Sequence, residues 1–134
     1  MAPKAPDTGA VIQVAAFRAA LRSFLHESER IGRRNGLTPQ RYLLLMMIKG
    51  APDSSERTTV TELADRLKLA QSTVTELVNR AEAAGLVMRE TSEDDGRVAH
   101  LRLTAEGERR LARTFTGLAD ERRQLRDAFA ELDR

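Results

Sequence analysis

Hydrogen-bonding side chains are concentrated in residues 70–80. Val74, Leu77 and Val78 recur there at spacings of three and four, which places them on one face of a helix. The opposite face carries Gln71, Ser72, Thr73, Thr75, Glu76, Asn79 and Arg80. Hydroxyl, amide and guanidinium groups gathered at the start of a helix are suited to contact base edges and phosphates in a major groove. The spacing therefore predicts a helix that contacts DNA.

Catalytic and metal chemistry find little support in the composition. The 134-residue chain has no Cys and only two His, which excludes disulfides, thiolate zinc sites and thiol redox switches. The sequence suggests no Ser-His-Asp or Cys-His set, and it contains no Gly-rich phosphate loop. We expect no enzyme, no bound metal and no cofactor.

A β-hairpin is expected directly after the polar helix. Its strands should cover residues 86–90 and 98–103, the second alternating Ala99, Leu101 and Leu103 inward with His100 and Arg102 outward. Gly96 permits a sharp turn, and Arg97 beside it could enter a narrow, negative minor groove. Asp95 can hold the guanidinium extended, and a purely structural turn ion pair is the alternative.

The elements on the amino-terminal side should position this helix. A short helix capped by Thr61 buries Leu63, Ala64 and Leu67, and three or four residues separate it from the polar helix. Two helices so joined, followed by a hairpin, form a winged helix-turn-helix. A further helix, with Thr38 as its N-cap and Pro39 at its first position, should cross the core through the apolar run at residues 42–48.

Two terminal segments carry apolar stripes that predict subunit pairing. Residues 8–36 form an amphipathic helix, and a heptad pattern of Leu111, Phe115, Leu118, Arg122, Leu125, Phe129 and Leu132 follows the hairpin. We expect a homodimer built on Val14, Phe17, Leu21, Leu118, Leu125, Phe129 and Leu132. A helix that packs on its own domain is the alternative. Gly117 makes a break in the last helix plausible.

Residues 37–111 resemble the MarR family of winged-helix transcriptional regulators. The most specific match is Asp95-Gly96-Arg97, followed at the family's distance by Leu103-Thr104 and the segment AEG. The resemblance implies a symmetric dimer whose recognition helices read the two half-sites of a pseudo-palindromic operator in double-stranded DNA. By position, Ser72, Thr73 and Thr75 would face the major groove and Arg97 the minor groove. Many such regulators release DNA when a small phenolic or lipophilic effector binds between the dimer and DNA lobes. His26, Tyr42 and Met46 are the candidates to line this pocket; burial in the core is the alternative for Tyr42 and Met46, and a helix residue without a ligand is the alternative for His26.

Some residues depart from the family pattern. Lys68 replaces the frequent turn Gly, and Ala70 replaces a frequent capping Ser. Residues 61–104 hold six basic and eight acidic residues, a net charge of −2, although the chain as a whole carries +2. Acidic groups near phosphates reduce affinity that is independent of sequence, so binding should depend on Arg80, Arg97, Arg102 and base contacts.

The predicted fold is mostly α-helical with a small β-hairpin wing. We expect four segments along the chain: a disordered tail at 1–7, a dimerisation helix at 8–36, a winged helix-turn-helix at 37–104 and a dimerisation helix or helices at 105–134. We expect a cytoplasmic, sequence-specific regulator, most simply a repressor, without a membrane partner. A winged-helix module for protein contacts or DNA architecture, with little sequence specificity, is the alternative.

Overall fold

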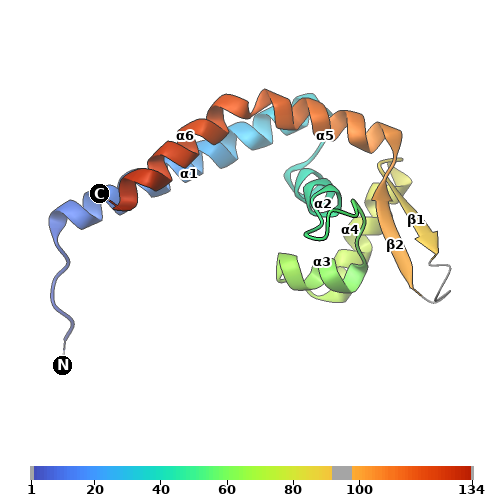
Figure 1. Cartoon of the computed structure of the whole chain (residues 1–134), viewed down its shortest axis with the longest axis horizontal. Coiled ribbons are helices and arrows are strands. Elements are labelled where there is room, and N and C mark those ends of the chain that lie inside the picture. Colours follow the sequence, from blue (N-terminus) through green and yellow to red (C-terminus); the bar gives the residue numbers. More distant parts are fainter. Residues whose placement is uncertain (1, 92–97, 134) are drawn as a thin grey trace.

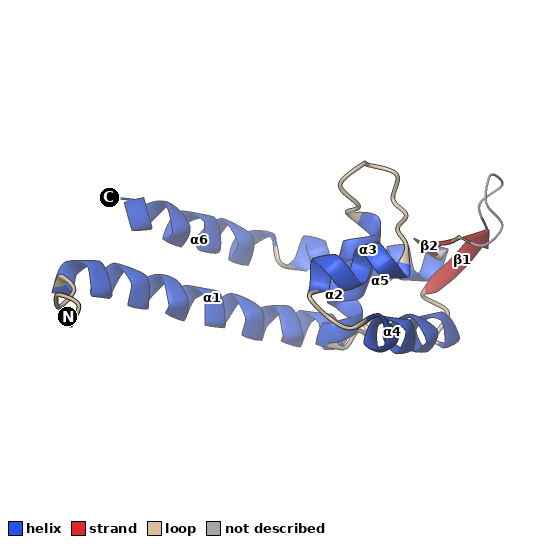
Figure 2. Ribbon diagram, turned by 90° about the horizontal axis from the view of Figure 1, so that it is seen from below, coloured by secondary structure: helices blue, strands red, loops and turns tan. Residues whose placement is uncertain are grey.

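The computed structural model describes residues 2–133 except 92–97 (Figures 1 and 2). Its elements are α1 (Thr8–Arg34), α2 (Pro39–Lys49), α3 (Val60–Leu67), α4 (Gln71–Ala83), β1 (Val87–Thr91), β2 (Ala99–Leu103), α5 (Ala105–Gly117), α6 (Ala119–Ala130) and the 3₁₀ helix η1 (Glu131–Asp133). The mostly helical architecture with one hairpin is as predicted.

The molecule consists of a long two-helix arm and a compact lobe. Helices α1 and α6 lie side by side and carry both chain ends away from the lobe (Figures 1 and 2). The lobe contains α2, α3, α4 and the hairpin, and α5 connects it to the arm (Figure 1). None of the described helices is both long and apolar enough to cross a lipid bilayer.

Side-chain caps determine where most of the helices begin. Thr38 Oγ1 accepts from the amide of Arg41 at 3.2 Å, and Pro39 occupies the first turn of α2, as predicted. The predicted cap of α3 at Thr61 is wrong: Thr59 Oγ1 accepts from the amide of Glu62 at 3.2 Å, so α3 begins two residues earlier. Thr59 and Glu62 have the capping-box spacing, which correctly marks this helix start.

The lobe has one continuous apolar core to which every element of the lobe contributes. Leu44, Leu45 and Ile48 of α2 are at most 1% exposed and occupy its centre. The apolar run of α2 is not buried on all sides, because Leu43 is 40% exposed. The core also includes Leu111 and Leu118, so it extends beyond Thr104, where the sequence suggested a boundary.

The hairpin is antiparallel, with Val87 opposite Leu103 and Glu90 opposite His100. Leu101 and Leu103 are buried as predicted, but Ala99 is exposed because it pairs with Thr91 at the end of the ladder farthest from the core. Thr58 adds a bridge on the other side of β2: its amide donates to the Leu101 carbonyl at 3.2 Å and its carbonyl accepts from the Leu101 amide at 2.7 Å. This second pairing of β2 fastens the loop before α3 to the hairpin.

Helix α5 ends at Gly117, where the sequence suggested a break. The contacts of Arg122 explain why this charged residue interrupts the heptad pattern. Its Nη1 donates to the Phe115 carbonyl at 2.5 Å, and its guanidinium carbon lies 3.7 Å from the centre of the Phe115 ring. The Phe115 carbonyl also accepts from the Leu118 amide at 3.2 Å, so Arg122 adds a second donor at the end of α5 and also stacks on an aromatic face.

Candidate nucleic-acid interface

Helix α4 presents its polar face outward. Val74, Val78 and Ala81 are 0% exposed and hold the helix against the core. Of the seven residues predicted to face DNA, Thr75 is half-buried and six are exposed: Gln71, Ser72, Thr73, Glu76, Asn79 and Arg80. The periodicity thus predicted which face of α4 is available to a partner.

No side chain caps the first turn of α4. Its N-cap, Ala70, has an extended backbone and no side-chain acceptor, whereas Thr38 and Thr59 cap the two preceding helices. The first amides of a helix have no partner inside the helix and carry the positive end of its dipole. A phosphate oxygen could therefore be accepted at this position.

The turn before α4 has three residues, Lys68 to Ala70, and its conformation is strained. Lys68 has φ 57° and ψ 43°, the left-handed region that favours glycine. The Leu69 amide donates to the Ala64 carbonyl at 3.1 Å and closes the turn. The turn therefore keeps the geometry that a glycine would supply, at a cost of about 1 kcal/mol.

The charges on α4 are partly neutralised within the helix. Arg80 Nη2 lies 2.5 Å from Glu76 Oε1, one helical turn away, and both side chains are exposed. An exposed pair of this kind contributes little to stability. Arg80 is therefore not an isolated cation on this face, and a DNA phosphate would compete with Glu76 for it.

Arg89 of β1 contacts the outer face of α4, although no sequence pattern marked it as a candidate. Its Nη2 donates to Asn79 Oδ1 at 2.6 Å, and its Nε lies 3.4 Å from Glu82 Oε1. These contacts tie the hairpin to the outer face of α4 and orient the Asn79 amide. Strand alternation could only have marked Arg89 as exposed, because the helix beside it becomes evident only in the fold.

Arg102 on β2 is a second described cation of the hairpin, besides Arg89 on β1. Arg102 Nη1 lies 3.8 Å from Glu90 Oε2 on the neighbouring strand, and both side chains are partly exposed. Asp95 and Arg97, predicted to form the tip of the wing, lie outside the described residues, so their roles remain predictions.

Comparison with known proteins agrees with this geometry. Residues 35–98 match the MarR family. A Thauera aromatica protein named for transcriptional regulation of the hcr operon is 34% identical over 101 residues, covering 75% of this chain and 54% of that protein. This chain carries a winged helix-turn-helix of the MarR family.

Two further proteins are similar to this chain. The HTH-type transcriptional repressor YetL of Bacillus subtilis (strain 168) is 32% identical over 92 residues, covering 69% of this chain and 54% of YetL. The structure of Sco3205, a MarR family transcriptional regulator from Streptomyces coelicolor in complex with DNA, has a TM-score of 0.68 at 29% identity, covering 92% of this chain and 77% of that one. The chain spans about half the length of the two curated relatives.

The residues predicted to form a dimer fall into two groups. Val14 and Phe129 are 50% and 59% exposed, and Phe17, Leu21, Leu125 and Leu132 are half-buried along the arm. Phe17 and Phe129 contact each other edge to face within one chain, with ring centres 5.8 Å apart. Leu118 is 1% exposed and belongs to the core of its own chain, which corrects its assignment to a partner surface.

A cavity of about 320 Å³ lies where the arm meets the lobe of this MarR chain. It is lined by Phe24, Leu25, Ser28, Glu29, Pro39, Tyr42, Leu43, Met46, Phe115 and Arg122. Tyr42 and Met46 both line this cavity, and their role in binding an effector stays a prediction. Burial raises the pKa of Tyr42, and the charge of Arg122 acts against that shift. His26 does not line this cavity; it lies in a separate groove along α1 with Arg18 and Arg22.

Proposed function

We propose that this protein is a transcriptional regulator, most simply a repressor, that binds double-stranded DNA by sequence through α4. The observation that carries the proposal is the exposed polar face at the start of α4, held outward by the buried residues Val74, Val78 and Ala81. A MarR relative of similar structure is named as a complex with DNA. The proposed role is DNA binding without catalysis. The proposed location of the protein is the cytoplasm, together with the DNA that it binds.

The proposed contacts divide into those that read bases and those that position the backbone. Ser72, Thr73 and Thr75 offer hydroxyls near the start of α4, where base edges would lie, and Glu76 could accept from a cytosine amino group. The uncapped first turn, Arg97 and Arg102 would contact phosphates or the minor groove. Since residues 61–104 carry a net charge of −2, we expect weak binding to unrelated DNA.

A homodimer is part of the proposal because the arm leaves apolar side chains uncovered. Val11, Val14 and Leu25 on α1 and Phe129 on α6 are each about half exposed or more. Two helices that pack only on each other leave apolar surface on their outer sides, and a second copy of the arm would cover it. The two-fold axis of such a dimer would set two α4 helices on successive turns of one face of a duplex.

Effector control is proposed for the cavity between arm and lobe. Its walls come from α1 and α6 of the arm and from α2 and α5. A phenolic or lipophilic molecule bound there would change the angle between arm and lobe, and hence the distance between the two α4 helices. DNA affinity would fall when that distance no longer matches the half-site spacing.

Selection of random duplexes by the purified protein tests the proposed function. We expect the retained DNA to share a pseudo-palindrome with half-site centres about 10 bp apart. Retention that is indifferent to sequence, or absent even at low salt, would contradict the proposal. It would favour a winged-helix module for protein contacts or DNA architecture.

A further inference from the structure

The side-chain amide of Asn79 on α4 is fixed in one orientation by the hairpin. Arg89 Nη2 donates to Asn79 Oδ1 at 2.6 Å, so the oxygen of the amide, and not its nitrogen, faces β1. Because the amide is planar, Nδ2 and its two N–H groups lie on the other side of Cγ. None of the described residues accepts a hydrogen bond from Nδ2, and Asn79 is exposed. Two oriented donors are therefore open to a partner outside the chain.

Arg89 can orient this amide because a second contact fixes its own guanidinium. Arg89 Nε lies 3.4 Å from Glu82 Oε1, and Glu82 is the neighbour of Asn79 one turn later on α4. A guanidinium carries its N–H groups in a rigid fork, so two acceptors on one helix determine its plane. The side chains of Arg89 and Glu82 are both less than half exposed, which limits competition from water.

The place of Asn79 along α4 favours a phosphate over a base as the acceptor. Residue 79 is eight positions after Gln71, about 12 Å along the helix axis. The major groove is about 12 Å wide, so a helix whose first turn reads bases has its third turn near the sugar-phosphate edge. The bidentate contact that Asn commonly makes with adenine needs Oδ1 as well as Nδ2, and Arg89 engages Oδ1. Phosphate oxygens need only the donors that remain.

We propose that Arg89 is a positioning residue for DNA binding: it turns the Asn79 amide so that Nδ2 donates to a backbone phosphate oxygen at the edge of the major groove. This inference rests on the proposed function, since it requires a duplex against α4. The contact stabilises the complex on any sequence, because phosphates carry no base information. It also makes DNA affinity depend on the hairpin, since a hairpin displaced from α4 would release the amide.

Affinities for the duplex recovered by selection and for an unrelated duplex, measured by fluorescence anisotropy at low salt, test the proposal. Asn79→Leu replaces the amide by an apolar side chain of similar volume. Arg89→Met removes the donor and keeps an unbranched stem, whereas Arg89→Lys restores one donor. Urea denaturation of each variant checks that it is folded.

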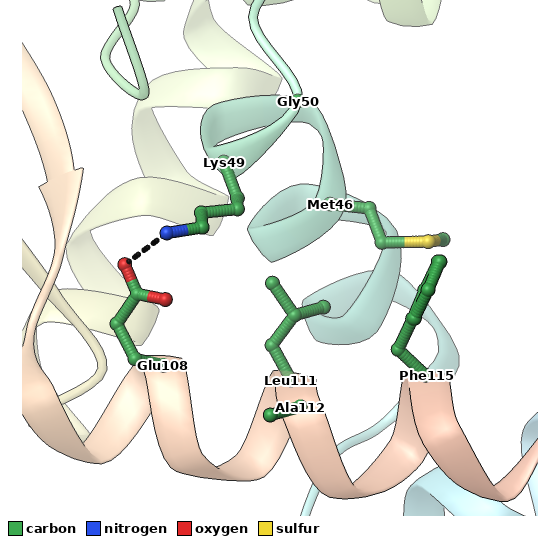
Figure 3. A pocket seen from close by; sticks show the side chains of 7 residues that line it. All are labelled: Met46, Lys49, Gly50, Glu108, Leu111, Ala112 and Phe115. Atoms are coloured by element: carbon green, nitrogen blue, oxygen red, sulfur yellow. Dashed lines mark hydrogen bonds and ion pairs between the residues drawn. The ribbon is translucent and has the colours of Figure 1, made fainter.

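Two controls separate this role from a general loosening of the lobe. Glu82→Gln removes the second carboxylate contact of Arg89 and leaves its bond to Asn79 in place. Glu108→Gln breaks the ion pair between Lys49 of α2 and Glu108 of α5, which lies away from α4 (Figure 3). Neither control should weaken binding or change the cost of Asn79→Leu.

We expect Asn79→Leu to weaken binding to both duplexes about tenfold, because a phosphate contact is lost whatever the sequence. In the Arg89→Met background the same substitution should cost about twofold or less, and in the Arg89→Lys background about fivefold. If Arg89 acted only through its charge, Asn79→Leu would cost the same in all three backgrounds. That result would overturn the proposal.

A neutral methylphosphonate placed at each phosphate of the selected duplex locates the contact. One substitution in each half-site should weaken the wild type about tenfold and Asn79→Leu about twofold or less. Equal wild-type affinity for the two duplexes would contradict the proposed function, and the Arg89 backgrounds would still decide the present inference. A changed base preference in Asn79→Leu, or the absence of a phosphate coupled to it, would overturn this inference alone. No binding to either duplex would overturn both.

Discussion

Lys68 keeps the backbone geometry of the turn between α3 and α4, where the family frequently has Gly, but its own conformation is strained. It occupies the left-handed position at the end of α3 that a glycine would occupy at lower cost. Its ammonium lies 3.9 Å from Asp65, and both side chains are more than 80% exposed, so this pair offsets little of the strain.

Replacing Lys68 by Gly should stabilise the fold. We expect the free energy of unfolding to rise by about 0.5–1 kcal/mol in urea denaturation, because glycine adopts positive φ without a Cβ clash. Lys68→Ala serves as the matched control, since it removes the charge but retains the strain. Equal stabilisation by both substitutions would show that charge, and not backbone geometry, is responsible.

Glu76 should lower affinity for DNA of any sequence. Glu76→Gln removes a carboxylate from the outer face of α4 and frees Arg80 from its pair, so we expect affinity to increase about three- to tenfold at low salt. Glu29→Gln breaks a pair of the same spacing with Arg33 on α1 and should have a smaller effect. If binding weakens specifically for the selected sequence, Glu76 instead accepts from a base.

Much of the arrangement of the elements follows from short sequence patterns. Apolar spacing and the caps at Thr38 and Gly85 predicted α1, α2, α4 and the turn after α4, in which Gly85 has φ 78°. Contacts between distant segments could not be read in the same way. The bridge of Thr58 to Leu101 and the bond of Arg122 to the Phe115 carbonyl depend on how the elements pack.

Position 107 requires a glycine, because the start of α5 packs directly against the backbone that follows α4. A Cβ at this position would lie 2.2 Å from the Leu86 carbonyl oxygen, which is backbone and cannot rotate away. Thr104 Oγ1 holds the same junction, donating to the Gly85 carbonyl at 2.6 Å and accepting from the Gly107 amide at 3.0 Å.

Gly107→Ala should therefore destabilise the lobe, although alanine is the better helix former. We expect a loss of about 2 kcal/mol in the free energy of unfolding, measured in urea. Gly9→Ala provides the control, because its Cβ meets only the Asp7 side chain, at 3.0 Å. Equal effects of the two substitutions would mean that the junction relaxes and that the close approach is not important.

At the scale of the whole molecule, the proposed dimer depends on the arm. Phe129→Asp or Val14→Asp would place a charge in the proposed interface, and we expect either variant to sediment as a monomer where the wild type sediments as a dimer. Val14 is tested as well because Phe129 also packs on Phe17 of its own chain. Met88→Asp alters an exposed apolar residue on the hairpin and should leave the dimer intact. Dimeric Val14→Asp and Phe129→Asp proteins would contradict the arm interface.

The sequence predicted which face of α4 points outward, but it did not predict which surfaces the apolar residues of the terminal helices contact. A helix pattern alone decides which side chains of α4 face away from the core, because its buried partners lie three and four residues apart. An apolar stripe does not say which surface covers it. Leu118 and Leu125 share one heptad pattern, yet the first lies in the core of the lobe and the second along the arm.

Repeating the random-duplex selection with Thr73→Val tests the central claim most directly. Valine keeps the shape of Thr73, an exposed residue near the start of α4, and removes its hydroxyl. If α4 reads bases in a symmetric dimer, the preferred base should change at one position of each half-site, with about 1–3 kcal/mol of discrimination lost. An unchanged motif recovered at uniformly lower affinity, or a change in only one half of the site, would contradict that claim.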